Sequence, residues 1–200
     1  MNIFRQWLPI GIVITMLSGA IFCTAQQIDR QNANDPQVAL SLELANRLDV
    51  LADLGDDEAA KIEVLGPKMI DELTPTYVEI STSLLPYLAI FDDQGNLISS
   101  NATLKGEVFH LPSGVFDYTR SHAIDKVTWQ PEPAVRQAIV VRRFQGQTTA
   151  GFVLAGRSLN EVETRISMLM ENVAIGWVAM MVVSFGAVAL VNQKRYGHHA

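Results

Sequence analysis

The chain has 200 residues, a formal net charge of −6 and an apolar fraction of 48%. All 21 acidic residues fall between Asp29 and Glu171, and this acidic central part argues against nucleic acid as a partner. The single cysteine, Cys23, excludes a disulfide within the chain, so the central part must be held together by its apolar core.

The first predicted element is a transmembrane helix over residues 7–27. No charge lies between Arg5 and Asp29, and an apolar run of this length crosses a bilayer. The alternative is a cleaved signal peptide, since Cys-Thr-Ala before Gln26 is an acceptable cleavage site. We favour a retained anchor because the apolar run is longer than the core of a usual signal peptide.

Small side chains recur at four-residue spacing along this first helix. Such a stripe lets a second helix approach closely in lipid, although small residues are also common in membrane helices in general. The residues that we predict to pack against another helix are Gly11, Thr15 and Gly19, in line with Cys23.

Helical signals follow the first span. Asp35-Pro36 supplies an N-cap and an N1 proline, and leucines at helical spacing continue this helix to Gly55. A second short helix is expected over residues 57–65 and a third over residues 68–73. We separate the two at Gly66-Pro67 because this pair usually ends a helix.

The apolar period then changes from helical to strand-like. Residues 87–91 and 96–100 flank the turn Asp92-Asp93-Gln94-Gly95, which predicts a β-hairpin. These elements indicate an α+β domain with N-terminal helices and an antiparallel sheet of about five strands, with the helices packed on one face of the sheet, between two transmembrane helices. The remaining predicted elements are a helix over residues 114–122 and strands over residues 126–130, 135–144 and 148–156.

A long helix closes the chain. Ser158 followed by Glu161 is a capping box, and the apolar residues after it recur as the a/d seam of a short coiled coil over residues 158–172. Residues 173–191 carry no charge and are long enough to form a second transmembrane helix. The helix-packing residues of the seam are Leu159, Val162, Ile166 and Leu169.

Basic residues, among them Arg5 and Lys194, flank the two spans on their outer sides, where there is no acid. The positive-inside rule places residues 1–6 and 192–200 in the cytoplasm and the domain of residues 28–157 outside it. An outer domain without disulfides fits a bacterial envelope, so we expect a two-pass protein of the bacterial plasma (inner) membrane.

The segment YLAIFDDQGNLISS (residues 87–100) resembles the opening hairpin of extracytoplasmic PAS-like sensor domains, the group called PDC or Cache. The resemblance extends over about residues 36–157, through the order of the predicted elements and the flanking membrane helices. It implies a small ligand held between the sheet and its covering loops. Such receptors continue into a cytoplasmic signalling module, whereas nine residues follow the second span here, so we expect a signal to leave through another protein.

No sequence pattern predicts catalysis, a cofactor or a metal site. His110 and His122 have no second ligand or base at useful spacing, and Asp92-Asp93 is more simply a turn-forming pair. Asn101-Ala-Thr103 is a glycosylation sequon only in a host that glycosylates.

Arginines that interrupt an apolar strand form the candidate ligand site. An arginine that faces a pocket with aromatic neighbours would hold a small carboxylate by paired hydrogen bonds. The simpler alternative, which we favour, is that these arginines are solvated on the open face of the sheet. The candidate ligand-binding residues are Trp129, Arg136, Arg157 and Tyr118.

Two functions fit these features. The first is a non-enzymatic sensory protein, a homodimer through its seam and membrane helices, which passes a conformational signal along its last helix to a membrane or cytoplasmic partner. The second is a structural or assembly subunit that uses the same fold as a protein-binding head. An envelope hydrolase, the third possibility, would need a catalytic group that the sequence does not reveal.

Overall fold

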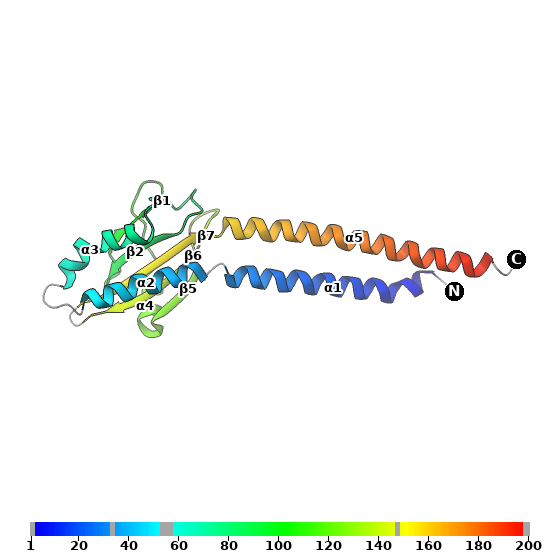
Figure 1. The fold of residues 1–200 in the computed structure, drawn as a ribbon, viewed down its shortest axis with the longest axis horizontal. Helices are drawn as coiled ribbons and strands as arrows, with labels where there is room; N and C mark the ends of the chain where they lie inside the picture. Colours follow the sequence, from blue (N-terminus) through cyan, green and yellow to red (C-terminus); the bar gives the residue numbers. More distant parts are fainter. Residues whose placement is uncertain (1–2, 33–34, 53–57, 147–148, 198–200) are drawn as a thin grey trace. The chain divides into compact units, whose positions relative to one another are not determined.

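The computed structural model describes residues 3–32, 35–52, 58–146 and 149–197. The chain divides into two compact units, one made of Met1–Arg30 with Val162–Ala200 and the other of Gln31–Glu161. The first unit consists of two long apolar helices, and the second is a domain of helices around a five-stranded antiparallel sheet (Figure 1). The α+β class predicted from the sequence is confirmed.

The sheet has the strand order β3-β2-β7-β6-β5. β7 is the last strand in the sequence but the central one in the sheet, where it pairs with β2 on one side and β6 on the other. A separate short parallel pair joins β1 (Val78–Glu79) to β4 (Ala102–Thr103). The five strands are β2 (Tyr87–Asp92), β3 (Leu97–Ser100), β5 (Ile124–Glu132), β6 (Val135–Gln145) and β7 (Ala150–Ser158).

Helices α2 (Asp35–Ala52) and α3 (Glu58–Leu73) cover one face of the sheet. Their apolar stripes follow the helical period, so their side chains converge on the sheet. Burial of this kind, at about 25 cal/mol per Å² of apolar surface, is the main source of stability for such a layer. The fully buried residues of this core layer include Leu44, Leu48, Ile62, Ile70, Ile90 and Val153.

The expected break between two short helices at Gly66-Pro67 is wrong, because α3 runs as one helix through Pro67. An interior proline removes one helical hydrogen bond. Buried Ile62 and Ile70 on either side anchor the helix to the sheet, and tertiary packing of this kind outweighs local propensity. Gly66 serves this packing, since a Cβ at that position would lie 2.9 Å from Cδ1 of Ile90.

The other face of the sheet is also covered, which differs from the expectation that helices lie on one face only. Helix α4 (Ser113–His122) contacts β5 and β6 and places Phe116 in a second core layer. The β1-β4 pair and the segment that leads to α4 contribute Val78, Ala102 and Phe109 to the same layer. The aromatic residues of this segment require burial, and α2 and α3 already occupy the first face.

The first unit contains α1 (Ile3–Asn32) and α5 (Asn160–Gly197), with the two predicted spans inside them. By length and composition both helices can cross a membrane. Among the described side chains, three hydrogen bonds join α1 to α5 in antiparallel order. They are Asn192 Nδ2 to Gln6 Oε1 at 2.7 Å, Trp7 Nε1 to Ser184 Oγ at 2.9 Å and Trp177 Nε1 to Thr15 Oγ1 at 3.0 Å.

Candidate functional site

Hydrogen bonds among the described residues hold the junction between β7 and α5. Arg157 Nη2 lies 2.6 Å from Glu161 Oε2, and Arg157 Nε donates to the carbonyl oxygen of Leu84 at 3.0 Å. The N–H of Leu159 donates to the carbonyl oxygen of Arg136 at 2.9 Å. Leu159 alone separates the end of β7 from the start of α5, so the central strand passes into the helix without a linker.

Ser158 and Glu161, the two predicted capping residues, make different contacts from those of the predicted capping box. The helix begins at Asn160 instead of Ser158, because Ser158 still pairs with Gln137 in the sheet. The Ser158 hydroxyl accepts a hydrogen bond from the N–H of Asn160 at 3.2 Å, and the Glu161 carboxylate pairs with Arg157. The two predicted capping side chains therefore hold both the helix and the strand that precedes it.

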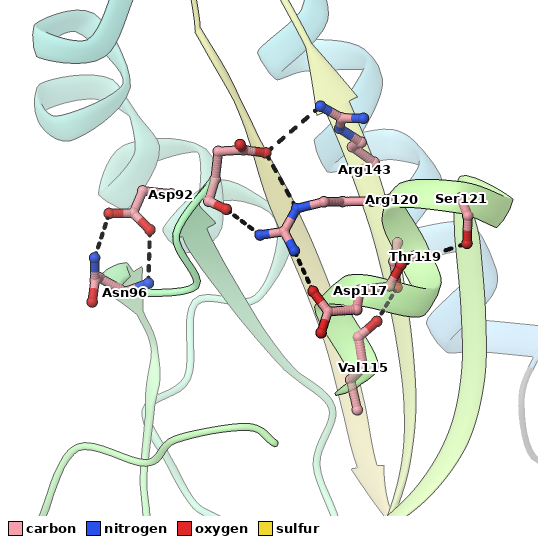
Figure 2. Close-up of polar contacts among 9 residues, drawn as sticks. Asp92, Asn96, Val115, Asp117, Thr119, Arg120, Ser121 and Arg143 are labelled. Carbon is pink, nitrogen blue, oxygen red and sulfur yellow. Dashed lines mark hydrogen bonds and ion pairs between the residues drawn. The ribbon is translucent and has the colours of Figure 1, made fainter. Parts of the chain in front are cut away.

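Charged side chains from three elements meet at the other end of β2 and β7 (Figure 2). Arg120 of α4 bonds the carbonyl oxygen of Asp93 and the carboxylate of Asp117. Asp93 Oδ1 lies 3.9 Å from Arg120 Nε and 3.6 Å from Nη2 of Arg143 on β6. The Arg120 guanidinium carbon lies 5.3 Å from the centroid of the Phe152 ring, a cation–π distance. This charged cluster thus links the β2-β3 turn to α4 and to β6.

The turn beside this cluster has the structure that its residues predict. Asp92 accepts hydrogen bonds from the N–H and the side-chain amide of Asn96, at 2.7 and 2.8 Å (Figure 2). Gly95 has φ of +88°, and a Cβ there would lie 2.8 Å from the ring of Phe116. Glycine is therefore required both by the backbone and by the close approach of α4.

Aromatic rings fill the layer between the sheet and the segments on the α4 side. Phe109 contacts Tyr87, Phe91 and Trp129, with ring centroids 5.6 to 6.2 Å apart. Phe116 lies 5.3 Å from Phe91 by the same measure. The resemblance noted above implies a small ligand between the sheet and its covering loops, and in this structure packed side chains occupy that layer.

Tyr87 and Gly156 approach each other closely in this layer. They are opposite each other in β2 and β7, and a Cβ on Gly156 would lie 2.3 Å from Cζ of Tyr87. The Tyr87 hydroxyl has no hydrogen-bond partner among the described residues, and burial raises the pKa of the phenol. The contact lies two residues before the end of β7 and fixes the central strand close to its exit into α5.

Glu79 organises the segment that follows β4. Its carboxylate accepts hydrogen bonds from the backbone N–H groups of Lys105 and Gly106, at 2.8 and 3.1 Å, and from the N–H and hydroxyl of Ser81. Partial burial acts to raise the pKa of this carboxyl. The hydrogen bonds from Lys105, Ser81 and Gly106 outweigh that effect and lower the pKa to about 2.

Asn101 is the buried polar hub of the domain. Its Oδ1 accepts from the N–H of Leu88 at 2.8 Å, and its Nδ2 donates to Thr74 and to the carbonyl oxygen of Thr76. The side chain thereby ties β2 to the end of α3. Because this amide is 5% exposed and fully used, the Asn101 sequon is not available for glycosylation in the folded domain.

Three of the candidate ligand residues lie on two different faces of the sheet. Trp129 is opposite Gln137 in register and is buried in the aromatic layer. Arg157 is opposite Ala138, the neighbour of Gln137, so it points to the other face. Arg136 shares that other face by the two-residue period of a strand.

Tyr118, the fourth candidate, lies half exposed on α4 and stacks on His122 with ring centroids 4.0 Å apart. The structure therefore does not bring the four residues to one site. Glu79, Asn101 and the Asp93–Arg120 contact were not predicted as sites. Each joins residues that are far apart in the sequence. The sequence singled out Asp93 only as a turn residue and Asn101 only as part of a sequon, and it gave no signal for Glu79.

The predicted helix-packing residues differ in their surroundings. Gly11 is buried beneath the ring of Trp7, which lies on the same helix. The hydroxyl of Thr15 accepts a hydrogen bond from the indole N–H of Trp177 on α5. Gly19 is exposed, with no atom within 4 Å of a Cβ placed there. The seam residues, all half-buried, are Leu159, Val162, Ile166 and Leu169.

Both histidines of the domain, His110 and His122, are exposed. Within the described part of the chain, no three His, Cys, Asp or Glu side chains are grouped so as to hold a metal ion. No protein-family model matches the sequence, and no curated protein matches it either.

Proposed function

We propose that this chain is a two-pass membrane protein whose outer domain, of the PAS-like sensory kind, passes a conformational change through α5 to a partner protein. In this proposal the protein is not an enzyme. It lies in the plasma membrane of a bacterium with both termini in the cytoplasm, and it works as a homodimer.

One observation carries the proposal: the central strand of the sheet runs directly into α5. Leu159 is the only residue between them, and its N–H is held by Arg136. Arg157 adds contacts to Leu84 and to Glu161 in the first helical turn. A shift of β7 relative to its neighbours would therefore move the first turn of the helix, which these contacts tie to the strand.

The charged cluster supplies the input end in this proposal. An acidic group of a ligand or partner would compete with Asp93 for the guanidinium groups of Arg120 and Arg143, since arginine binds carboxylates by paired hydrogen bonds. Release of Asp93 would free the β2-β3 turn from α4 and alter the pairing of β2 with β7. The small carboxylate expected from the sequence would then bind here instead of between Trp129 and the arginines.

Cross-linking of α1 to α5 tests the transmission. Cysteines replace Gln6 and Asn192, whose side chains are hydrogen-bonded, in a Cys23→Ser background of the full chain in lipid. The rate of disulfide formation reports the geometry at the far ends of the two helices. We expect Asp93→Ala to change this rate, and we expect Ile166→Pro to abolish the change because it breaks α5.

The matched control for the input is Asp71→Ala, which removes an exposed acid from α3 and should leave the rate unchanged. Circular dichroism of each variant shows whether the outer domain remains folded. An Asp93→Ala effect that persists in full with proline at position 166 would show that α5 does not transmit the change.

The second candidate function is an assembly subunit, and the filled aromatic layer favours it because no ligand is needed to complete the core. A groove of about 550 Å³ between α2 and α3, lined by Val50, Leu65 and Met69 with Arg47 and Glu72, offers a surface for a protein partner. Purification in mild detergent separates the two functions. A stoichiometric protein partner that is retained without ligand, and lost in Val50→Asp, would favour assembly.

A further inference from the structure

A groove of about 300 Å³ runs along α1 in the first unit. It is lined almost entirely by α1, with Met181 as the contribution of α5. Leu8, Ile12 and Met16 are its large, exposed apolar side chains. Its remaining lining residues are Trp7, Gly11 and Thr15.

A basic side chain continues the line of this groove. Arg5, Leu8, Ile12 and Met16 follow one another at spacings of three, four and four residues, which places them on one face of a helix. Arg5 is exposed at the end of that face. The bond between Gln6 and Asn192 brings the end of α5, with exposed Lys194, to the same level. The groove is therefore apolar along its length and positively charged at one end.

We propose that this groove binds an anionic phospholipid, with an acyl chain along Leu8, Ile12 and Met16 and the phosphate at Arg5. Charge complementarity and the apolar lining match the two parts of such a molecule. Trp7 lies between them, at the depth where indole rings favour the membrane interface. This inference rests on the membrane placement given under the proposed function.

A helix from a second copy of the chain fits the groove less well. Close helix packing in lipid needs a small residue at which the two backbones can approach. Gly11 and Thr15 are the small residues of this groove. The Trp7 ring already covers Gly11, 3.3 Å from the position of a Cβ, and Thr15 accepts the bond from Trp177. Trp7 is held in place by its bond to Ser184 and by an edge contact with Phe185. A flexible acyl chain can follow the surface that remains.

Tryptophan quenching by brominated lipid tests the proposal with the full chain in bilayers. Trp177→Phe removes the other tryptophan of the membrane unit, and Trp129 is buried in the outer domain and gives a constant background. The probes are phosphatidylglycerol and phosphatidylcholine with brominated acyl chains, each added as a minor component to unlabelled phosphatidylcholine. We expect the anionic lipid to be enriched about fivefold at Trp7. Arg5→Gln should remove this preference, and Arg5→Lys should keep it.

Three other outcomes would overturn the proposal and are distinguishable. Equal quenching by both lipids would refute the lipid site and leave the membrane placement standing. No quenching by either lipid, even when all of the phosphatidylcholine is brominated, would refute the membrane placement as well. In the third outcome, quenching shows no headgroup preference and rises as the protein is diluted in lipid. This result would show that a second copy of the chain occupies the groove, because dilution separates the copies and lets lipid reach Trp7.

Discussion

Arg157 and Glu161 form an ion pair of 2.6 Å across the boundary between the central strand of the sheet and the first turn of α5. The side chains are 36% and 32% exposed, so solvent screens the pair and its contribution to the free energy of unfolding is small, about 0.2–1 kcal/mol. Its importance is geometric. It ties the first turn of α5 to the strand, together with the bond from Arg157 to the carbonyl oxygen of Leu84.

Removing this ion pair should loosen the junction without unfolding the domain. In Arg157→Gln and Glu161→Gln we expect faster amide hydrogen exchange in the first turn of α5 and a melting temperature close to that of the wild type. Arg47→Gln, which breaks the exposed pairs with Glu43 and Glu72, is the control and should leave exchange at the junction unchanged. Unchanged exchange in both junction variants would show that the pair does not tie the first turn to the strand.

The contact of Gly156 with Tyr87 predicts that a single methyl group is not tolerated there. Gly156→Ala would place Cβ 2.3 Å from the buried phenol ring and should destabilise the domain by about 1–3 kcal/mol in denaturant unfolding. Gly114→Ala is the matched control because no atom lies within 4 Å of its Cβ position. It should be neutral or stabilise α4 by up to about 1 kcal/mol. Equal stability of the two variants would contradict the packing described for β2 and β7.

Loss of the Asn101 hub should destabilise the domain more than loss of a surface amide. Asn101→Ala leaves the N–H of Leu88 and the carbonyl oxygens of Thr74 and Thr76 with one partner fewer each, at a cost of about 2–4 kcal/mol. Asn96→Ala, which removes an exposed turn amide, should cost less than about 1 kcal/mol. Denaturant midpoints measured side by side test the difference, and a similar cost for both would refute the role of Asn101 as a hub.

Glu79 makes the domain sensitive to acid. The pKa of its carboxyl in the folded protein is about 2, below the usual value of 4.5. The stabilisation is therefore complete above about pH 4.5 and is lost as the pH falls toward 2. Glu79→Gln should lower the melting temperature at pH 7 and flatten its decline between pH 4.5 and pH 2. The contact is disproved if the wild type and Glu79→Gln decline in parallel over that interval.

Local signals in the sequence were sufficient to predict most of the helices and strands of the domain. The hairpin at Asp92–Gly95 was predicted because its turn chemistry acts over four residues, and the structure has the expected glycine with positive φ. The break at Gly66-Pro67 was wrong because burial of Ile62 and Ile70 on the sheet overrides the local preference. The expectation that helices pack on one face did not anticipate α4 on the other face, because the sequence does not reveal that two core layers are needed.

The candidate site was less accessible to sequence reasoning. The two-residue period of a strand places Arg136 and Arg142 on one face, but it does not determine which face each strand shares with its neighbours. The strand register places Trp129 opposite Gln137 and Arg157 opposite Ala138, the next residue of β6. The side chains of Trp129 and Arg157 therefore lie on opposite faces of the sheet. The contact between Arg120 and Asp93 depends on the approach of α4 to the hairpin, which follows only from the complete fold.

The membrane topology predicts which cysteines can be labelled in intact cells. In a Cys23→Ser background, Ser121→Cys on the exposed surface of α4 should react with a membrane-impermeant maleimide added from outside. Gln193→Cys, exposed near the end of α5, should react only after the membrane is permeabilised, because the proposed topology places both termini in the cytoplasm. Phe91→Cys is the control for folding, since that position is fully buried and should react only after denaturation. Labelling of Gln193→Cys from outside would reverse the orientation, and protection of Ser121→Cys would place the domain in the cytoplasm.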